Sequence, residues 1–303
     1  METLTETQKR ILALKREKNA LILAHFYVPL AVQAVADFVC DSFEMAKRAK
    51  NAQEDIVIIC GVMFMGESAK VLTPHKKVLL PVVEAGCPMA DMITKDDVLR
   101  LRAAHPKAKV MCYVNSTAEV KGVSDICCTS STAVRIAQAI DTEEIIFIPD
   151  KNLGHFVAGQ VPDKTFIFHD GYCPVHNKIT KQDVLNAKAA HPNAKFAVHP
   201  ECREEVVQLA DFVGSTSAII EYATTSDARE FLIGTEQEIA ARLTRDMPDK
   251  KFYTVTETFL CTNMKKITAE TVLRCLETEA FQVMLDSRVA DGAGAALHKM
   301  VNA

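Results

Sequence analysis

The chain has 303 residues, 49% of them hydrophobic and 24% charged, with a formal net charge of −4, as expected for a globular protein with a buried core. The slight negative charge argues against a nucleic acid or an anionic membrane as partner, no apolar run is long enough to cross a bilayer, and the N-terminus lacks a secretory-signal pattern. We therefore expect a cytoplasmic protein whose ten cysteines are reduced and serve as apolar filler, metal ligands or catalysts.

Strands and helices alternate along the chain after a helical segment at residues 1–19. Short apolar runs rich in β-branched residues predict strands at 20–27, 37–39, 56–61 and 77–81, and later at 144–150, 165–170, 230–234 and 252–256. Helical patterns such as 42–50 and 131–140 lie between them. Continuous apolar strands are typical of parallel sheets buried on both faces, and their alternation with helices predicts right-handed βαβ units.

Two sequence landmarks each occur three times with nearly equal spacing. The motif C-x5-I-T-x-x-[DT]-V-L begins 86 and then 88 residues apart, at Cys87, Cys173 and Cys261. The blocks DFVCDS, DICCTS and DFVGST begin 88 and then 86 residues apart, at Asp37, Asp125 and Asp211. A period this long indicates a small domain repeated three times. We predict three homologous αβα sandwich domains with small parallel sheets, at 20–106, 107–192 and 193–303, arranged around a pseudo-threefold axis.

The repeated cysteines are expected in loops at the carboxyl ends of the parallel strands. A good helix N-cap follows each of them, at Thr94, Thr180 and Thr268, so each cysteine lies between a strand and a helix. Open α/β sheets bind their ligands at this edge.

Polar side chains are predicted at the same edge of each sheet. Pairs spaced i, i+2 end the first strand of each unit, at His25 and Tyr27, Tyr113 and Asn115, and His199 and Glu201. Hydroxyl residues after the second strand, expected to open helices, are Ser42, Ser130 and Thr216. If the three units face a common axis, these side chains and the three thiols surround one cavity.

Three converging thiolates predict a soft metal site for zinc, copper(I) or an iron–sulfur cluster. Structural zinc sites usually contain close cysteine pairs, and the sequence has no C-x-x-C. A cubane cluster has a threefold axis that matches the repeat, and its fourth iron would be left open to substrate as a Lewis acid. The pattern favours the cluster and leaves zinc as the alternative.

The blocks of the sequence resemble those of the quinolinate synthase family over almost the whole chain. In order they are ILAHFY, ADFVCDS, EAGCPMADM, CYVNSTAEVK, CCTSSTA, IFIPDKNLG, GYCPVH, VHPEC, DFVGSTS, FLIGTE and CTNMKKIT. The resemblance implies three αβα domains and a 4Fe–4S cluster with three cysteine ligands and one open iron, here at Cys87, Cys173 and Cys261. It also implies condensation of iminoaspartate with dihydroxyacetone phosphate to quinolinate, with loss of phosphate and two waters, for NAD biosynthesis. An enzyme that supplies iminoaspartate is the implied protein partner.

The same resemblance assigns roles to the polar residues. Those implied to move protons are Tyr27, Tyr113 and Glu201. Those implied to bind substrate or product are His25, Ser42, Tyr113, Val114, Asn115, Ser130, His199, Pro200, Glu201 and Thr216. The sequence departs from the family pattern at Cys40, Thr262 and His169, none of them a proposed ligand. Only Cys275 lies beyond Cys261, so we expect no C-terminal disulfide switch.

Two other functions remain open from the residues alone. A cluster-dependent lyase would dehydrate one hydroxy acid without forming a carbon–carbon bond, and release of phosphate from the triose phosphate distinguishes condensation from it. A redox carrier would hold its cluster with four protein ligands and would not need converging histidines and hydroxyls.

Overall fold

The computed structural model describes residues 4–303 and contains three four-stranded sheets. The strand orders are β2-β1-β3-β4, β6-β5-β7-β8 and β10-β9-β11-β12, which is the same order three times. All pairings between these strands are parallel. The predicted fold class, three αβα units with small parallel sheets, is therefore confirmed.

The first unit follows the predicted order of strands, helices and cysteine loop. Its elements are α1 (Glu6–Glu17), β1 (Ala20–His25), α2 (Leu30–Gln33), β2 (Phe38–Cys40), α3 (Ser42–Lys50), β3 (Ile56–Cys60), α4 (Met63–Leu72), β4 (Lys77–Leu79), the 3-10 helix η1 (Ala90–Met92) and α5 (Lys95–Ala104).

The second and third units repeat that order. The second contains β5 (Lys109–Tyr113), α6 (Ala118–Gly122), β6 (Ile126–Cys128), α7 (Ala133–Ala139), β7 (Glu144–Ile148), α8 (Lys151–Gln160), β8 (Thr165–Phe168), α9 (Pro174–Asn177) and α10 (Lys181–Ala190). The third contains β9 (Lys195–Val198), α11 (Glu204–Val207), β10 (Phe212–Val213), α12 (Thr216–Thr225), β11 (Glu230–Gly234), α13 (Glu238–Asp246), β12 (Lys251–Thr254), α14 (Thr262–Lys265), α15 (Ala269–Thr278) and the C-terminal α16 (Ser287–Asn302).

Local sequence explains where the helices after the cysteines begin. Thr94, Thr180 and Thr268 each accept a hydrogen bond from the backbone N–H three residues on, and the side chain of that residue accepts the backbone N–H of the threonine. These reciprocal bonds satisfy backbone donors that the first turn of a helix leaves free. All three predicted N-caps are thus confirmed.

The helix after each cysteine packs against the following unit. Helix α5 lies against β5 and α6, α10 lies against α11, and α15 returns to lie against α1 and α2 of the first unit. Each cysteine loop therefore crosses from one sheet to the next, and the third crossing closes a ring. The division of the chain at 106/107 and 192/193 stays a prediction.

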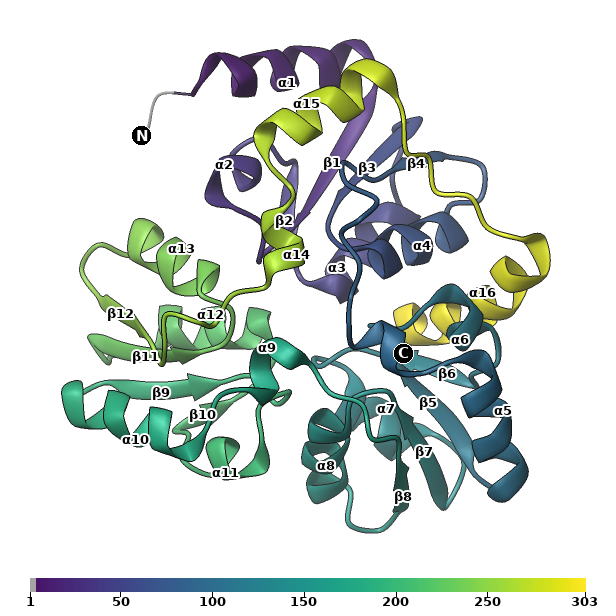
Figure 1. Ribbon diagram of the computed structural model, residues 1–303, viewed down its shortest axis with the longest axis vertical. Helices are drawn as coiled ribbons and strands as arrows, with labels where there is room; N and C mark the ends of the chain where they lie inside the picture. Colours follow the sequence, from purple (N-terminus) through teal and green to yellow (C-terminus); the bar gives the residue numbers. More distant parts are fainter. Residues whose placement is uncertain (1–3) are drawn as a thin grey trace.

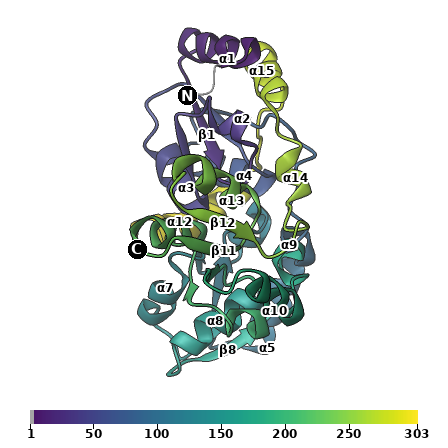
Figure 2. The ribbon, with the colours of Figure 1, turned by 90° about the vertical axis from the view of Figure 1, so that its left-hand side faces the viewer.

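The three units form the corners of a triangle around the molecular centre (Figure 1), with β1–β4 at the top, β5–β8 at the lower right and β9–β12 at the lower left. In the turned view of Figure 2, α9 and α14 lie on one face of the molecule, and α7 and α12 lie on the other. The loops that precede α9 and α14, those of Cys173 and Cys261, therefore lie on the same side of the molecule. None of the helices in residues 4–303 has the length and apolar character needed to span a membrane.

The C-terminal helix α16 joins the first two units, because it packs against α4 of the first and against α6 and β6 of the second. Its approach to α6 is close: a β-carbon on Gly292 would lie 2.6 Å from the carbonyl oxygen of Gly122. A β-carbon on Gly294, two residues on, would meet a methyl group of Val71 at an ordinary 3.6 Å.

We predict that Gly292→Ala lowers the free energy of unfolding by about 1–3 kcal/mol, because backbone atoms of α6 and α16 must separate. Gly294→Ala in the same helix is the matched control. It is expected to leave the free energy unchanged or to raise it by up to about 1 kcal/mol through better helix propensity. Urea unfolding of both variants measures the difference, and equal stabilities would contradict the close packing of α16.

Candidate active site

A cavity of about 250 Å³ lies where the three units meet, and residues of all three line it. The three repeated cysteines line it, as do most of the polar residues that the sequence predicts, namely His25, Tyr27, Ser42, Tyr113, Asn115, Ser130, His199, Glu201 and Thr216. Part of the remaining wall is apolar, with Phe64, Met65 and Met264. The predicted convergence of the strand ends on one cavity thus appears in the structure.

Two equivalent histidines face this cavity as neutral hydrogen-bond donors. Nδ1 of His25 accepts the N–H of Tyr27 at 3.2 Å, and Nδ1 of His199 accepts the N–H of Glu201 at 3.3 Å. Burial lowers the pKa of His25 to about 4 and that of His199 to about 3. Both rings are therefore neutral at pH 7. Because Nδ1 of each ring accepts a hydrogen bond, the ring proton is on Nε2.

A continuous chain of hydrogen bonds links Tyr27 to Glu201 through residues of different units. The hydroxyl of Tyr27 lies 2.8 Å from Oγ1 of Thr216 and 2.9 Å from Oγ1 of Thr235. Thr235 in turn lies 3.0 Å from Nε2 of His176, and Nδ1 of the same ring lies 2.9 Å from Oε2 of Glu201. The two residues predicted to carry protons are therefore held in one network.

Glu201 carries the negative charge of this network. Burial alone would raise its pKa, but hydrogen bonding from the neighbouring His176 ring favours the ionised carboxylate and lowers the pKa. Burial, and next the charge of Glu201, raise the pKa values of Tyr27 and Tyr113 well above 10. At neutral pH Glu201 is therefore an ionised base that lines the cavity together with two neutral phenols, which is a suitable set for proton transfer.

Two buried polar atoms in the cavity have no hydrogen-bond partner. They are Oδ1 of Asn115 and Oε1 of Glu201, and within residues 4–303 no other buried side-chain nitrogen or oxygen is left unpaired. Because a buried polar atom without a partner is costly, such atoms in a cavity indicate that a polar ligand or an ion completes the site.

The three cysteines occupy equivalent, half-buried positions around the cavity. Burial raises the pKa of each thiol, whereas the backbone N–H three residues further on, that of Ala90, His176 or Met264, lowers it. An amide at the equivalent position of each unit therefore approaches each sulfur. Such donors stabilise a thiolate once a metal displaces its proton.

The three cysteine sulfurs are not placed to share a single ion. Ligands of a single tetrahedral ion with bonds of about 2.3 Å have sulfurs about 3.8 Å apart. Within residues 4–303, the three cysteine sulfurs do not form a group of ligand atoms within 4.8 Å of one another. A cluster that binds each cysteine through a different iron requires that wider spacing.

Acidic side chains hold two of the cysteine loops. Asp150 is fully buried, caps the N-terminus of α8 and accepts the N–H of Cys173 at 3.1 Å. In the third unit, Glu236 is also fully buried and accepts the N–H of Cys261 at 3.3 Å. These carboxylates fix the backbone from which the sulfurs project.

Some predicted residues lie differently from the rest. Val114 and Pro200 do not line the cavity, so a role for their side chains in substrate binding stays a prediction. Ser42 and Thr216 begin α3 and α12 as expected, but Ser130 stands in the turn before α7, which begins at Ala133. Thr129 and Thr132 form hydrogen bonds that close this turn, so the helix begins after it.

Four residues of the site were missed by the sequence analysis. His176 and Thr235 bridge the proton carriers, the Nδ2 of Asn152 donates to the carbonyl of Glu201 at 3.0 Å, and Lys178 supplies the one ammonium group that lines the cavity. Asn152 lies in the first turn of α8. The motif GYCPVH contains His176, and its position three residues after a repeated cysteine was the available signal.

Three α/β units that direct thiols, neutral histidines and an ionised carboxylate into one cavity define an enzyme with a cysteine-lined active site between its units. The family model described as quinolinate synthetase A protein matches residues 9–302. The chain belongs to the quinolinate synthase family, whose enzymes act in NAD biosynthesis, and the resemblance seen in the sequence is confirmed.

Similar proteins from bacteria and an archaeon match along nearly their full length. A quinolinate synthase of Caldicellulosiruptor saccharolyticus is 52% identical over 294 residues, which cover 97% of both chains. One from Clostridioides difficile is 48% identical over 94% of this chain and 93% of its own. Quinolinate synthase 2 of Methanosarcina acetivorans is 48% identical over 97% of this chain and 94% of its own.

We predict that the cluster-free protein loses stability as the pH falls below 6.5. The folded pKa values of His25 and His199, about 4 and 3, lie below the ordinary 6.5, so the unfolded chain binds protons that the folded chain rejects. The contribution of each neutral histidine to the free energy of unfolding is complete above pH 6.5 and is lost as the pH falls toward the folded pKa values. At pH 5.5 the loss is about 1.4 kcal/mol per histidine.

Urea unfolding at pH 7.5 and 5.5 tests this pH dependence. A double variant, His25→Gln with His199→Gln, is expected to lose less stability between the two pH values than the natural protein. His75→Gln, at an exposed histidine, is the matched control and should behave as the natural protein does. An equal loss in all three proteins would show that the two buried rings are not neutral.

Proposed function

We propose that this enzyme condenses iminoaspartate with dihydroxyacetone phosphate to form quinolinate, with release of one phosphate and two waters. The observation that carries the proposal is the convergence of three cysteines, two neutral histidines and one ionised carboxylate on a cavity with unpaired polar atoms. Family membership supports quinolinate as the product.

The neutral donors of the cavity suit a substrate with two carboxylates. The Nε2–H groups of His25 and His199 and the hydroxyls of Ser42, Ser130 and Thr216 can donate to carboxylate oxygens without the cost of burying further charge. The unpaired side chain of Asn115 adds a polar contact. Together they position the imine carbon next to the proton carriers.

Glu201 and Tyr27 are proposed to move the protons of condensation and dehydration. Glu201 is ionised and 3% exposed, so it can accept a proton, whereas Tyr27 is neutral and can donate one. Thr235 and His176 hold both in place. The enclosing walls also keep water from the imine, which would hydrolyse it.

A 4Fe–4S cluster held by Cys87, Cys173 and Cys261 suits three thiols that line one cavity and that are each approached by a backbone amide. When bound, it would supply an open iron as a Lewis acid for a hydroxyl or carboxylate oxygen.

We predict about four irons per chain after anaerobic purification. Cys87→Ser, Cys173→Ser and Cys261→Ser should each remove the cluster and abolish phosphate release that depends on iminoaspartate. Cys60→Ala, at a core cysteine in β3 that does not line the cavity, is the matched control and should retain iron and activity. Normal iron content and turnover in Cys173→Ser would refute the ligand assignment.

Lys178 is expected to attract the phosphate of the triose, because it is the one lysine or arginine that lines the cavity and its side chain is exposed at the mouth. Lys178→Gln should raise the KM for dihydroxyacetone phosphate about fivefold, the value of a solvent-screened ion pair, with a smaller effect on kcat. The effect should shrink at high salt. Lys181→Gln, at the exposed start of α10, is the control, and equal KM values in the two variants would exclude this role.

A further inference from the structure

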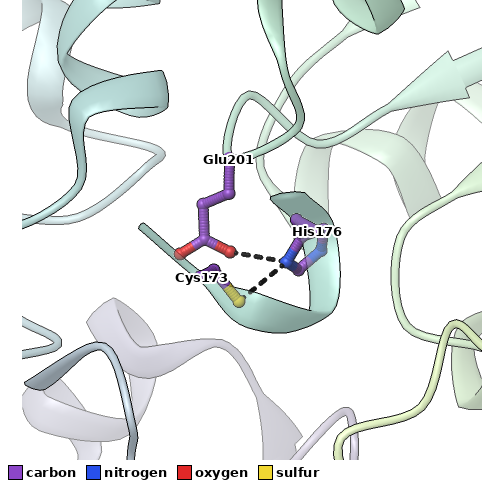
Figure 3. A group of neighbouring side chains, drawn as sticks. All are labelled: Cys173, His176 and Glu201. Atoms are coloured by element: carbon purple, nitrogen blue, oxygen red, sulfur yellow. Dashed lines mark hydrogen bonds and ion pairs between the residues drawn. The ribbon is translucent and has the colours of Figure 1, made fainter. Parts of the chain in front are cut away.

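One of the three repeated cysteines has metal-ligating neighbours of its own. Nδ1 of His176 lies 3.2 Å from Sγ of Cys173 and 2.9 Å from Oε2 of Glu201. Figure 3 shows His176 on the short helix α9 and Cys173 directly before that helix, with Glu201 directed at them from a neighbouring loop. Within residues 4–303, this is the one group of three such residues whose ligand atoms all lie within 4.8 Å of one another.

The spacing of these atoms is close to that of ligands on a single ion. Tetrahedral zinc, with bonds of about 2.0 Å to nitrogen and oxygen and 2.3 Å to sulfur, places nitrogen about 3.3 Å from oxygen and about 3.5 Å from sulfur. The observed separations of 2.9 and 3.2 Å would have to increase by about 0.3–0.4 Å. One thiolate, one imidazole and one carboxylate form a three-ligand set of the kind that leaves a fourth position open, here toward the cavity.

The surroundings of the group meet the needs of a bound ion. Nε2 of His176 lies 3.0 Å from Oγ1 of Thr235, which can accept its proton when Nδ1 binds metal and so fix the ring. His176 and Glu201 are 1% and 3% exposed, and Oε1 of Glu201 has no hydrogen-bond partner. A buried negative charge with an unpaired oxygen is the environment that a cation stabilises.

We propose that the cluster-free protein binds one divalent ion of the zinc class through Cys173, His176 and Glu201. Because Cys173 takes part, an ion in this site and a cluster on the three repeated cysteines exclude each other. The ion site itself is independent of the proposed function, whereas its effect as a competitor of cluster assembly rests on that function. A cell rich in zinc and poor in iron would thus hold the protein in an inactive zinc form.

Titration with Co²⁺ under anaerobic conditions tests the site in the full-length protein freed of iron and sulfide. We expect one Co²⁺ per chain, with a thiolate-to-cobalt charge-transfer band and the visible bands of four-coordinate cobalt. Cys173→Ser should abolish the charge-transfer band. His176→Asn and Glu201→Gln should weaken Co²⁺ binding more than tenfold, and Thr235→Val about tenfold. Circular dichroism and melting of each variant establish that it is folded.

Cys87→Ser and Cys261→Ser are the decisive controls, because these sulfurs belong to the cluster site but not to the ion site. Both variants should bind Co²⁺ with the same spectrum and affinity as the natural protein. Loss of binding in either variant would mean that the three cysteines share the ion, and absence of binding in the natural protein would also overturn the proposal.

Competition is measured by adding one equivalent of Zn²⁺ before reconstitution with iron and sulfide. We expect cluster formation to be blocked in proportion to bound zinc and to be restored when a chelator removes it. Uptake of the full cluster with zinc still bound would overturn the exclusion. Iron and sulfide counts of protein purified anaerobically test the proposed function separately, since Co²⁺ binding can succeed in a protein that never holds a cluster.

Discussion

The constraint on which this structure depends is the common direction of strands in three parallel sheets. In each sheet the carboxyl ends of all four strands lie at one edge. The segment after the last strand crosses to the next unit, where the following helix packs. Three such crossings form a ring, and the ring places one cysteine at each crossing. The cavity is therefore a product of connectivity as much as of packing.

The chemistry of the cavity follows from which groups are charged there. Burial keeps both histidines neutral and both tyrosines protonated, so the negative charge of Glu201 is not neutralised by a fixed cation deep in the site. Lys178 stands at the mouth, where water surrounds it. The neutral donors add no further charge to the cavity, which limits the cost of desolvation there.

The three cysteine positions are equivalent in backbone but not in surroundings. The residue three positions after each cysteine is Ala90, His176 or Met264, and only the histidine reaches both the sulfur and Glu201. The repeat therefore gives the three cysteine loops an equivalent backbone. The residue three positions after the cysteine is polar in the second unit, His176, and apolar in the third, Met264.

The sequence by itself determined the three-unit α/β fold, the cysteine loops, the N-caps and the strand-end polar pairs, because periodicity, capping and repeat spacing are local properties. It did not reveal that α5, α10 and α15 pack on the next unit, that Ser130 lies before its helix, or that His176 and Thr235 join Tyr27 to Glu201. Only the tertiary structure decided these points, because hydrogen bonds between units depend on distances of a few ångströms between residues far apart in the chain.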